Sequence, residues 1–333
     1  MREILRIEDL HTYFYTYRGA LKALTGVSFS LYHGEILGLV GETGCGKSVT
    51  ARSIMRLIKE PGKIVSGKII YKGQNLLSLS NEEMRKIRGK EISMIFQEPM
   101  TSLNPVFKIG TLMSEVIMVH RDIDKKNALK LAKKMLKEVK MPDPDIIIEK
   151  YPFELSGGMR QRIMIAMALS LNSKILIADE PTTALDVTIQ GQILKLILEL
   201  SQKKGTSVLL ITHDLGVVAN VADRVIVMYA GNLVEEGSTM SIFTNPSHPY
   251  TKGLLRSLPS LTREGEELPT IPGNLPNLIH PPEGCLFYDR CEIKEDYCAT
   301  FRPGRFHLGK GHYIWCHKIK NEKMENLGYG RAD

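Results

Sequence analysis

The feature that most constrains the fold of this chain is a glycine-rich run, Gly41-Glu42-Thr43-Gly44-Cys45-Gly46-Lys47-Ser48. It fits the phosphate-binding pattern GxxxxGK followed by Ser or Thr. Glycines let backbone N–H groups curl around a polyphosphate, and the positive end of the following helix attracts the anion. Residues 35–40 predict a buried strand before the run, and residues 49–58 predict a helix after it. The run therefore predicts a nucleotide-binding fold rather than an unrelated glycine-rich turn.

Each position of this run has an expected contact. Lys47 is expected on the β- and γ-phosphates, and Ser48 on Mg²⁺. Cys45 occupies a variable position and is interpreted as a small filler. The residues expected to contact the nucleotide here are Glu42, Thr43, Gly44, Cys45, Gly46, Lys47, Ser48 and Val49.

The rest of the chain alternates strands and helices in the manner of a mainly parallel α/β sheet. Apolar runs at 175–178 and 208–212 flank a helical pattern at 187–203, and strand-helix-strand order favours parallel strands. Residues 1–34 alternate apolar and polar side chains, as a half-exposed antiparallel sheet does. The other expected segments are strands at 69–71 and 91–97, a mostly helical stretch at 108–172 broken at 141–144, and a hairpin at 224–237.

Polar side chains at strand ends supply the expected chemistry. Asp179 and Glu180 follow the strand at 175–178. Asp179 is expected to hold Mg²⁺, directly or through water, and Glu180 to act as the general base on the attacking water. Gln97 is expected to touch Mg²⁺ and sense the γ-phosphate, and His213 to hydrogen-bond that phosphate and orient the water. A lone Gln or His at a strand end would be structural, so both expectations depend on the phosphate-binding run.

A second anion-binding helix start is predicted at Leu155-Ser-Gly-Gly-Met-Arg-Gln-Arg162. Ser156 can cap the helix, and Gly157 and Gly158 let backbone approach an anion at its positive end. One chain seldom needs two such sites for one nucleotide. A head-to-tail dimer explains the pair, with each nucleotide clamped between the phosphate-binding run of one subunit and the Ser-Gly-Gly helix of the other.

With these motifs in order, the chain resembles the nucleotide-binding subunit of an ABC transporter. The Walker A motif (41–48), Q-loop (Gln97), signature (155–161), Walker B (175–180), D-loop (184–186) and H-loop (His213) cover residues 3–255. The resemblance implies an ABC-type P-loop NTPase core with an antiparallel β subdomain and a helical subdomain at about 98–160. It also implies a role for Asp186 at the nucleotide, and an aromatic residue that stacks on adenine. Phe14 is the candidate, with Tyr13 and Tyr17 as competitors.

Two further stretches resemble the oligopeptide and dipeptide importers within that family. These are Gln97-Glu-Pro-Met-Thr-Ser-Leu-Asn-Pro105 and Asn245-Pro-Ser-His-Pro-Tyr-Thr-Lys-Gly-Leu-Leu255. The resemblance implies import driven by ATP-dependent closure of two such subunits, either identical or different, against two membrane permeases. A substrate-binding protein would act indirectly. Nickel and some oligosaccharides are carried by the same group, so the cargo stays open, as does the subunit pairing.

The charge of the chain bears on its surroundings. The net charge is +7 and the pI about 9.0, but no stretch concentrates the charge. The densest basic segment, 125–140, has helical apolar spacing, which predicts a solvated amphipathic helix rather than a nucleic-acid surface. A soluble ABC ATPase acting on DNA or ribosomes is the weaker hypothesis, because such proteins often carry two cassettes or long coiled-coil insertions, whereas this chain has one cassette and a short helical region. No apolar run of membrane-spanning length occurs, and a peripheral place on the cytoplasmic membrane face is expected.

Four cysteines gather near the end of the sequence. Their spacing is Cys285-x₅-Cys291-x₆-Cys298-x₁₇-Cys316. It lacks the close pairs of zinc sites and favours a 4Fe-4S cluster somewhat. The alternatives are Zn²⁺, free thiols, or disulfides, which a reducing cytosol disfavours. The pattern from Gly284 to Cys291 also resembles a feature of the peptide importers, some of which are similar to 4Fe-4S proteins there. Whether such a cluster would be structural or redox-sensing is left open. The expected organisation is a nucleotide-binding domain (1–258), a Pro-rich connector (259–283), a small Cys-rich domain (284–320) and a disordered tail (321–333).

Overall fold

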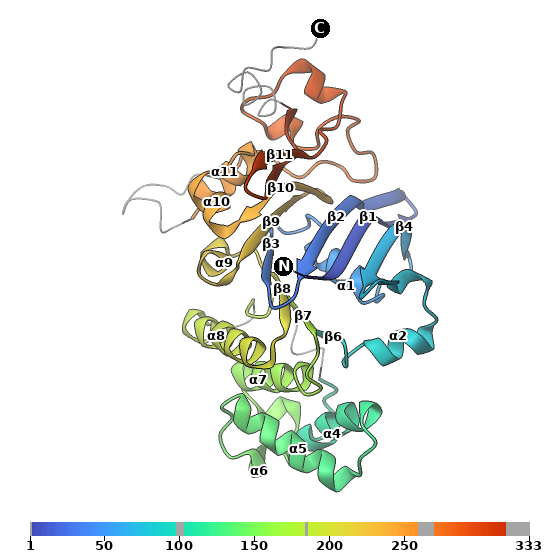
Figure 1. Cartoon of the computed structure of the whole chain (residues 1–333), viewed down its shortest axis with the longest axis vertical. Helices are drawn as coiled ribbons and strands as arrows, with labels where there is room; N and C mark the ends of the chain where they lie inside the picture. The colour runs from blue at the N-terminus through green and yellow to red at the C-terminus, as the bar shows by residue number, and fades with distance from the viewer. Residues whose placement is uncertain (1, 98–102, 184–185, 259–269, 318–333) are drawn as a thin grey trace. The chain divides into compact units, whose positions relative to one another are not determined.

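The computed structural model describes residues 2–97, 103–183, 186–258 and 270–317 (Figure 1). Parts of the expected Q-loop segment, D-loop, connector and tail lie outside these residues. The described chain divides into two compact units. One contains residues 32–35 and 78–211, and the other contains residues 3–31, 36–77 and 212 onward.

The first unit contains the expected parallel strands. Strand β7 (Ile175–Asp179) lies between β6 (Ile92–Ile95) and β8 (Ser207–Ile211) and runs parallel to both. Every residue of β7 and β8 is buried, as the continuous apolar runs predicted, because a parallel strand covered on both faces has no solvent side. Asp179 is the last residue of β7, opposite Ile211 in register.

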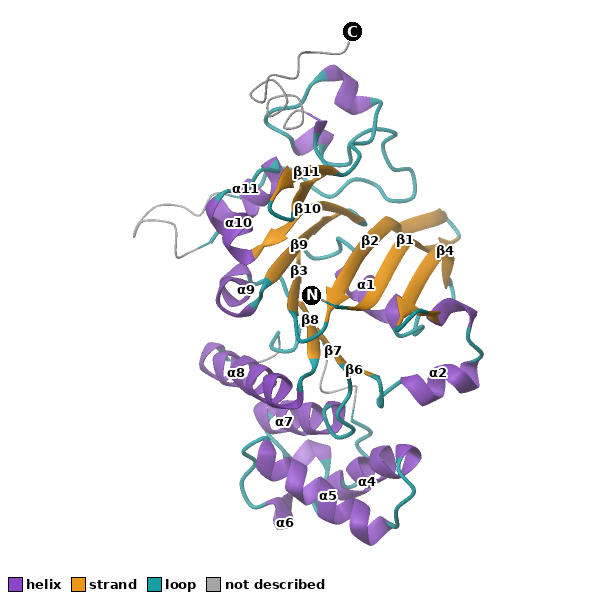
Figure 2. Cartoon of the chain, in the orientation of Figure 1, coloured by secondary structure: helices purple, strands orange, loops and turns teal. Residues whose placement is uncertain are grey.

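Helices make up the rest of the first unit (Figure 2). Helix α5 (Lys125–Glu138) has the predicted amphipathic pattern: Ala128, Ala132 and Leu136 are buried while its lysines face solvent. Asp124 caps it by accepting from Asn127 N–H at 2.8 Å. The remaining elements are α2 (Asn81–Ile87), α4 (Ile109–His120), α6 (Pro144–Ile147), η2 (Pro152–Glu154), α7 (Gly157–Ala168) and α8 (Val187–Lys204).

The second unit contains the antiparallel strands expected at the N-terminus. Strand β1 (Glu3–Thr16) is antiparallel to β4 (Gly62–Tyr71), in the order β2-β1-β4-β5 with β2 (Gly19–Tyr32) and β5 (Gln74–Asn75). The strand expected at 69–71 is only the end of β4. Helix α1 (Lys47–Ile54) is shorter than expected, because Arg56 has a left-handed φ of 50° that helical backbone does not tolerate.

The second unit also contains the predicted strand at 35–40, the predicted hairpin at 224–237, and two short strands that the sequence did not predict. Strand β3 (Ile36–Val40) pairs in parallel with β9 (Arg224–Tyr229), and β9 forms the predicted hairpin with β10 (Asn232–Ser238). Strand β12 (His312–Ile314) adds to β10, and β11 (Phe306–Gly309) adds to β12. The remaining elements of this unit are η1 (Leu76–Ser78), α9 (Leu215–Val221), α10 (Thr239–Thr244), α11 (Pro249–Arg256), η4 (Tyr288–Arg290) and η5 (Asp296–Ala299).

These contacts do not support a separate Cys-rich C-terminal domain. The tail continues the sheet of the nucleotide-binding fold through β12 instead of forming a sheet of its own. Phe287 is buried in the same apolar cluster as Val40, Tyr229 and Tyr250. A domain needs its own hydrophobic core, and this segment shares one with the strands before it.

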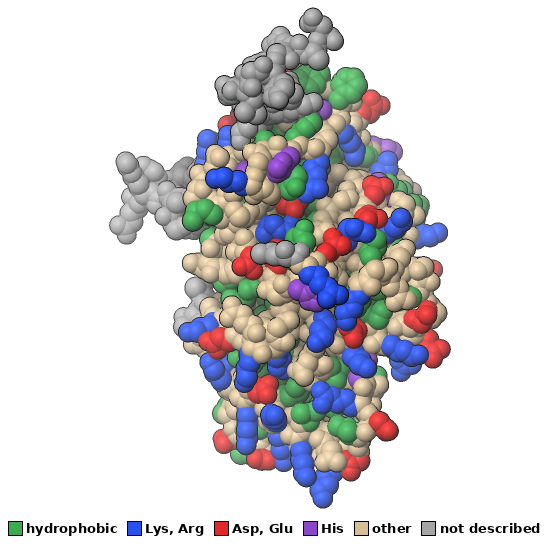
Figure 3. All heavy atoms as spheres, in the orientation of Figure 1, with side chains coloured by type: hydrophobic (Ala, Val, Ile, Leu, Met, Phe, Trp, Pro, Cys, Tyr) green, Lys and Arg blue, Asp and Glu red, His purple; other side chains and the backbone are tan. Residues whose placement is uncertain are grey.

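The charged side chains on the surface are dispersed, as the sequence indicated. On the face shown in Figure 3, basic and acidic side chains are interspersed. Within the residues that the structure describes, no helix is long and apolar enough to cross a membrane.

Candidate nucleotide-binding site

Glycines shape the phosphate loop between β3 and α1. Gly41, Gly44 and Gly46 have φ values of 152°, 84° and 109°, where side chains are disfavoured. A Cβ at Gly41 would lie 2.1 Å from Met228 O, and one at Gly46 would lie 2.9 Å from Ala23 O. The loop therefore needs glycine for both conformation and space. Thr43 and Gly44 at its tip are exposed, so the cradle is open to solvent.

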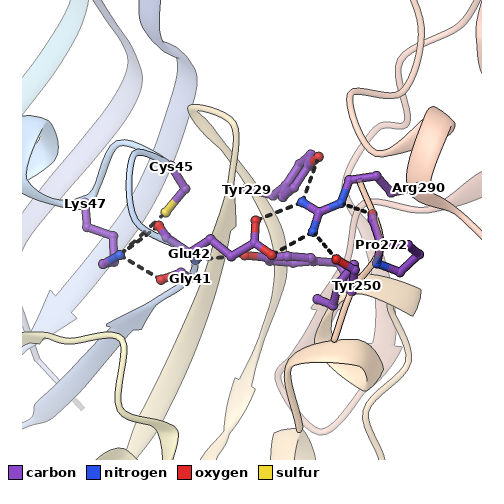
Figure 4. Close-up of polar contacts among 9 residues, drawn as sticks. Gly41, Glu42, Cys45, Lys47, Tyr229, Tyr250, Pro272 and Arg290 are labelled. Carbon is purple, nitrogen blue, oxygen red and sulfur yellow. Dashed lines mark hydrogen bonds and ion pairs between the residues drawn. The ribbon is translucent and has the colours of Figure 1, made fainter. Parts of the chain in front are cut away.

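Lys47 begins helix α1 and folds back over the loop. Its buried Nζ donates to Gly41 O at 2.7 Å and to Glu42 O at 3.0 Å (Figure 4). Cys45 is buried beside it, and burial raises the pKa of the Cys45 thiol. Cys45 N–H and C=O are both engaged, with Glu42 O and Gly231 N–H. The ammonium group is thus held where an anion in the cradle would meet it, and the glycine geometry fits a bound polyphosphate.

The second residue of the loop has partners that the sequence did not reveal. Arg290 donates to both carboxylate oxygens of Glu42, at 2.8 and 2.9 Å, and Glu42 N–H donates to Tyr250 Oη at 2.8 Å (Figure 4). Arg290 belongs to the Gly284–Cys291 pattern, which was interpreted only for its cysteines. The only sequence signal for this contact was an arginine inside that pattern. Its partner Glu42 lies 248 positions away and could not be predicted from the sequence.

Glu180 is held in the other unit. Its backbone is left-handed, with φ 46°, and its N–H donates to Ile211 O at 2.9 Å. Its Oε2 accepts from Gln97 Nε2 at 3.1 Å and from Thr183 Oγ1 at 2.8 Å. Asp179 and Glu180 are both nearly buried, at 1% and 8% exposure. The structure therefore brings Gln97, Glu180 and Thr183 together.

Helix α7 has the expected capped start. Ser156 Oγ accepts from Met159 N–H at 3.4 Å, and Gly157 and Gly158 form the first turn. Further along the helix, buried Gln161 donates to Pro181 O at 2.6 Å, next to Glu180 in sequence. Asp186 is the N-cap residue of α8. The start of α7 is thereby linked to the segment that follows β7.

The remaining candidates are less constrained. Phe14 on β1 is half-buried, and a Cβ at Gly62 would lie 2.6 Å from its ring. Tyr17 is 91% exposed, and Tyr13 donates to or accepts from His11 Nδ1 at 3.4 Å. His213 follows β8 in sequence and is exposed. Phe14, His213 and the phosphate loop belong to one unit, whereas Gln97, Ser156, Asp179, Glu180 and Asp186 belong to the other.

Comparison with known proteins decides the family. Residues 24–183 match the family described as ABC transporter, and residues 234–298 match the oligopeptide/dipeptide transporter C-terminal region. The chain is 51% identical over 317 residues to the dipeptide transport ATP-binding protein DppD of Bacillus subtilis (strain 168), covering 95% of each chain. The chain belongs to the ABC transporter ATPases of the oligopeptide/dipeptide group. It is therefore an ATPase coupled to transport, with ATP and Mg²⁺ as the nucleotide and ion of its family.

Other ABC proteins agree with this assignment. The oligopeptide transport ATP-binding protein OppD of Escherichia coli (strain K12) is 47% identical over 308 residues, 91% of each chain. Among solved structures, the ATP-binding cassette MJ0796, a dimer bound to ADP and Pi, has a TM-score of 0.64 at 26% identity. The match covers 71% of this chain and 99% of that one. The ABC ATPase α/β fold expected from the sequence is thus confirmed.

The predicted 4Fe-4S cluster is wrong. Among the described residues, which include all the tail cysteines, no three Cys, His, Asp or Glu side chains are placed to hold a metal ion. The zinc alternative fails for the same reason. Cys285 and Cys291 pack against the apolar cluster around Phe287, and burial raises the pKa of both thiols, that of Cys285 to about 11. In the described structure no disulfide joins the tail cysteines, which are Cys285, Cys291, Cys298 and Cys316.

Proposed function

We propose that this ABC ATPase energises the import of dipeptides and oligopeptides through a pair of membrane permeases. The observation that carries the proposal is the presence, in one chain, of the ABC transporter match and the oligopeptide/dipeptide C-terminal match. The names of the relatives, DppD and OppD, favour peptide cargo over nickel or oligosaccharide. No nucleic-acid partner is proposed.

In this proposal the phosphate loop, residues 42–49, binds ATP through Lys47 and through backbone N–H groups other than those of Glu42 and Cys45, which donate to Tyr250 Oη and Glu42 O. Ser48, Gln97 and Asp179 would hold Mg²⁺, which would supply positive charge that offsets the negative charge of the phosphates. The left-handed glycines keep the cradle open, and Phe14 stacks on the base.

Glu180 is the proposed general base, and its surroundings suit that role. Gln97 and Thr183 both donate to one carboxylate oxygen, Oε2, so the carboxylate has a fixed orientation. A carboxylate held in this way would accept the proton of the attacking water. His213 would hydrogen-bond the γ-phosphate and help to orient that water.

Two subunits would share each nucleotide. Ser156, Gly157 and Gly158 would present the positive end of α7 to the nucleotide bound by the opposite subunit, and Asp186 would act at the same interface. The dimer of the related cassette MJ0796 favours this arrangement. The second ATPase subunit is identical or different. The helical region about 98–160 would push on the permeases at the cytoplasmic membrane face, and a substrate-binding protein would deliver cargo.

Uptake by the reconstituted transporter tests the proposal. The chain is co-expressed with its two permeases and second ATPase subunit, and the complex is placed in vesicles together with the substrate-binding protein. ATP-dependent uptake of a labelled dipeptide is then measured against labelled nickel and an oligosaccharide. Peptide uptake that stops when ATP is replaced by ADP is expected. Uptake of nickel or oligosaccharide without peptide would overturn the cargo assignment.

A further inference from the structure

An arginine of the C-terminal segment reaches into the nucleotide-binding fold. Arg290 is 9% exposed, and its guanidinium contacts both carboxylate oxygens of Glu42. The two parallel N–H···O contacts form the bidentate geometry that makes arginine–carboxylate pairs both strong and directional. The Glu42 pair is the main cause that raises the pKa of Arg290, so the guanidinium stays charged at any accessible pH.

Glu42 transmits this contact to the phosphate loop. Its side chain is held by Arg290, its N–H by Tyr250 Oη, and its C=O by Lys47 Nζ. Tyr250 is fully buried and packs on Tyr229 and Phe287, so it is not free to follow a shifted loop. Glu42 is thus fixed by its side chain, its backbone N–H and its backbone C=O together.

The Arg290–Glu42 pair also removes a charge repulsion at the phosphate loop. Glu42 is a carboxylate within a loop whose purpose is to hold a polyphosphate, and like charges at short range repel. Its side chain is only 28% exposed, so solvent screens it incompletely. Arg290 neutralises it from the side away from Lys47, as Figure 4 shows. Without Arg290, an unpaired carboxylate would face the bound nucleotide and attract the Lys47 ammonium.

We propose that Arg290 is a positioning residue of the nucleotide site, which fixes Glu42 and neutralises its carboxylate so that ATP affinity depends on the C-terminal segment. The inference rests on the proposed nucleotide site. It gives the C-terminal region a part in ATP binding that does not require a metal.

Arg290 also has contacts that serve folding alone. It donates to Ile271 O and Pro272 O, and its guanidinium lies 5.7 Å from the Tyr229 ring centroid. A purely structural role would lower stability without changing ATP affinity in the folded protein. The two roles are separated by a second substitution at Glu42, because only the charge role predicts rescue there.

The test measures the Kd of a fluorescent ATP analogue for the full chain, together with its unfolding temperature. Arg290→Gln is expected to raise Kd about tenfold, Arg290→Lys to raise it less, and Arg290→Gln with Glu42→Gln to recover most of the affinity. Arg305→Gln is the matched control, because Arg305 pairs with Glu236 in the same unit, away from the loop. It is expected to leave Kd unchanged.

The outcomes are separable. Two results would overturn the inference: a Kd for Arg290→Gln equal to that of Arg305→Gln, or a Kd for the double variant as high as that of Arg290→Gln. In either case, ATP binding by the wild type would still support the nucleotide site. Absence of binding by the wild type would instead overturn the proposed function. If Arg290→Gln does not fold, Arg290→Lys decides: an unchanged Kd contradicts the positioning role, and a Kd raised threefold or more upholds it.

Discussion

At the scale of single residues, the proposed mechanism depends most on one carboxylate, that of Glu180. Glu180 sits at a left-handed φ that costs a non-glycine residue roughly 1 kcal/mol or more. Its N–H is held by Ile211 O, which keeps this conformation in place. In this conformation the carboxylate accepts hydrogen bonds from Gln97 and Thr183.

Removing the Thr183 hydroxyl tests this orientation. Thr183→Val keeps the side-chain shape but deletes the donor to Glu180 Oε2. We expect kcat of ATP hydrolysis to fall about fivefold, since one hydrogen bond to a charged group contributes about 1 kcal/mol or more, with KM unchanged. Thr244→Val, which removes an exposed hydroxyl on α10, is the control. Equal kcat values for the two variants would show that Thr183 does not orient the base.

The positions of candidate site residues were predictable where those residues lie at strand ends. Asp179 and Glu180 could be singled out because a buried strand exposes polar groups only at its end. Arg290 could not, because its partner Glu42 is brought near only by the packing of Phe287 against Tyr229 and Tyr250. The geometry of that packing depends on tertiary structure and has no signature in the local sequence.

At the scale of elements, long periodic segments were predicted well and short ones were not. The helix expected at 187–203 is α8 (Val187–Lys204), which ends at left-handed Gly205. Strands β11 and β12 were missed because each is short and mixed in composition. They are strands only because β10 offers an edge to pair with, and such tertiary pairing overrides weak local preference.

A comparison of two serine N-caps distinguishes an effect on stability from an effect on function. Ser80 caps α2 and Ser156 caps α7, each by accepting an N–H three residues on. Ser80→Ala and Ser156→Ala should each cost roughly 1 kcal/mol of unfolding free energy in a urea titration. Under the proposed dimer, only Ser156→Ala should also lower the ATPase rate, because α7 would then act on the nucleotide of the opposite subunit. Equal rates for both variants would contradict that role for α7.

At the scale of the whole molecule, the C-terminal segment belongs to the nucleotide-binding fold. Phe287 packs on Tyr229, Tyr250 and His248 with ring centroids 5.2 to 5.8 Å apart. The cysteine spacing pointed to a metal-stapled module because a core-poor sequence normally needs such a staple. The described structure instead gives this segment a share of an existing core, which the spacing of cysteines alone could not reveal.

Buried His248 predicts an acid-sensitive core. Burial lowers its pKa to about 4, and its Nδ1 accepts from Tyr250 N–H. The unfolded chain takes up a proton near pH 6.5 and the folded chain does not, so stability is complete above about pH 7 and falls as the pH drops toward 4. Between pH 7 and pH 5 the loss should be about 2 kcal/mol.

Urea unfolding at these two pH values measures this loss. His248→Asn should remove about that amount of the pH dependence, whereas His33→Asn, at an exposed position, should remove none. Identical pH dependence in wild type and His248→Asn would show that this imidazole is not the acid-sensitive group.

The central claim is that this subunit hydrolyses ATP with Glu180 as the base. The most direct measurement is single-turnover ATP hydrolysis by the assembled transporter carrying Glu180→Gln, with ATP binding measured on the same sample. Gln keeps the shape and the contact with Thr183 but cannot accept the proton. The account predicts a rate at least about 100-fold lower than wild type, with ATP bound and the two nucleotide-binding subunits closed. A rate near that of wild type would contradict it.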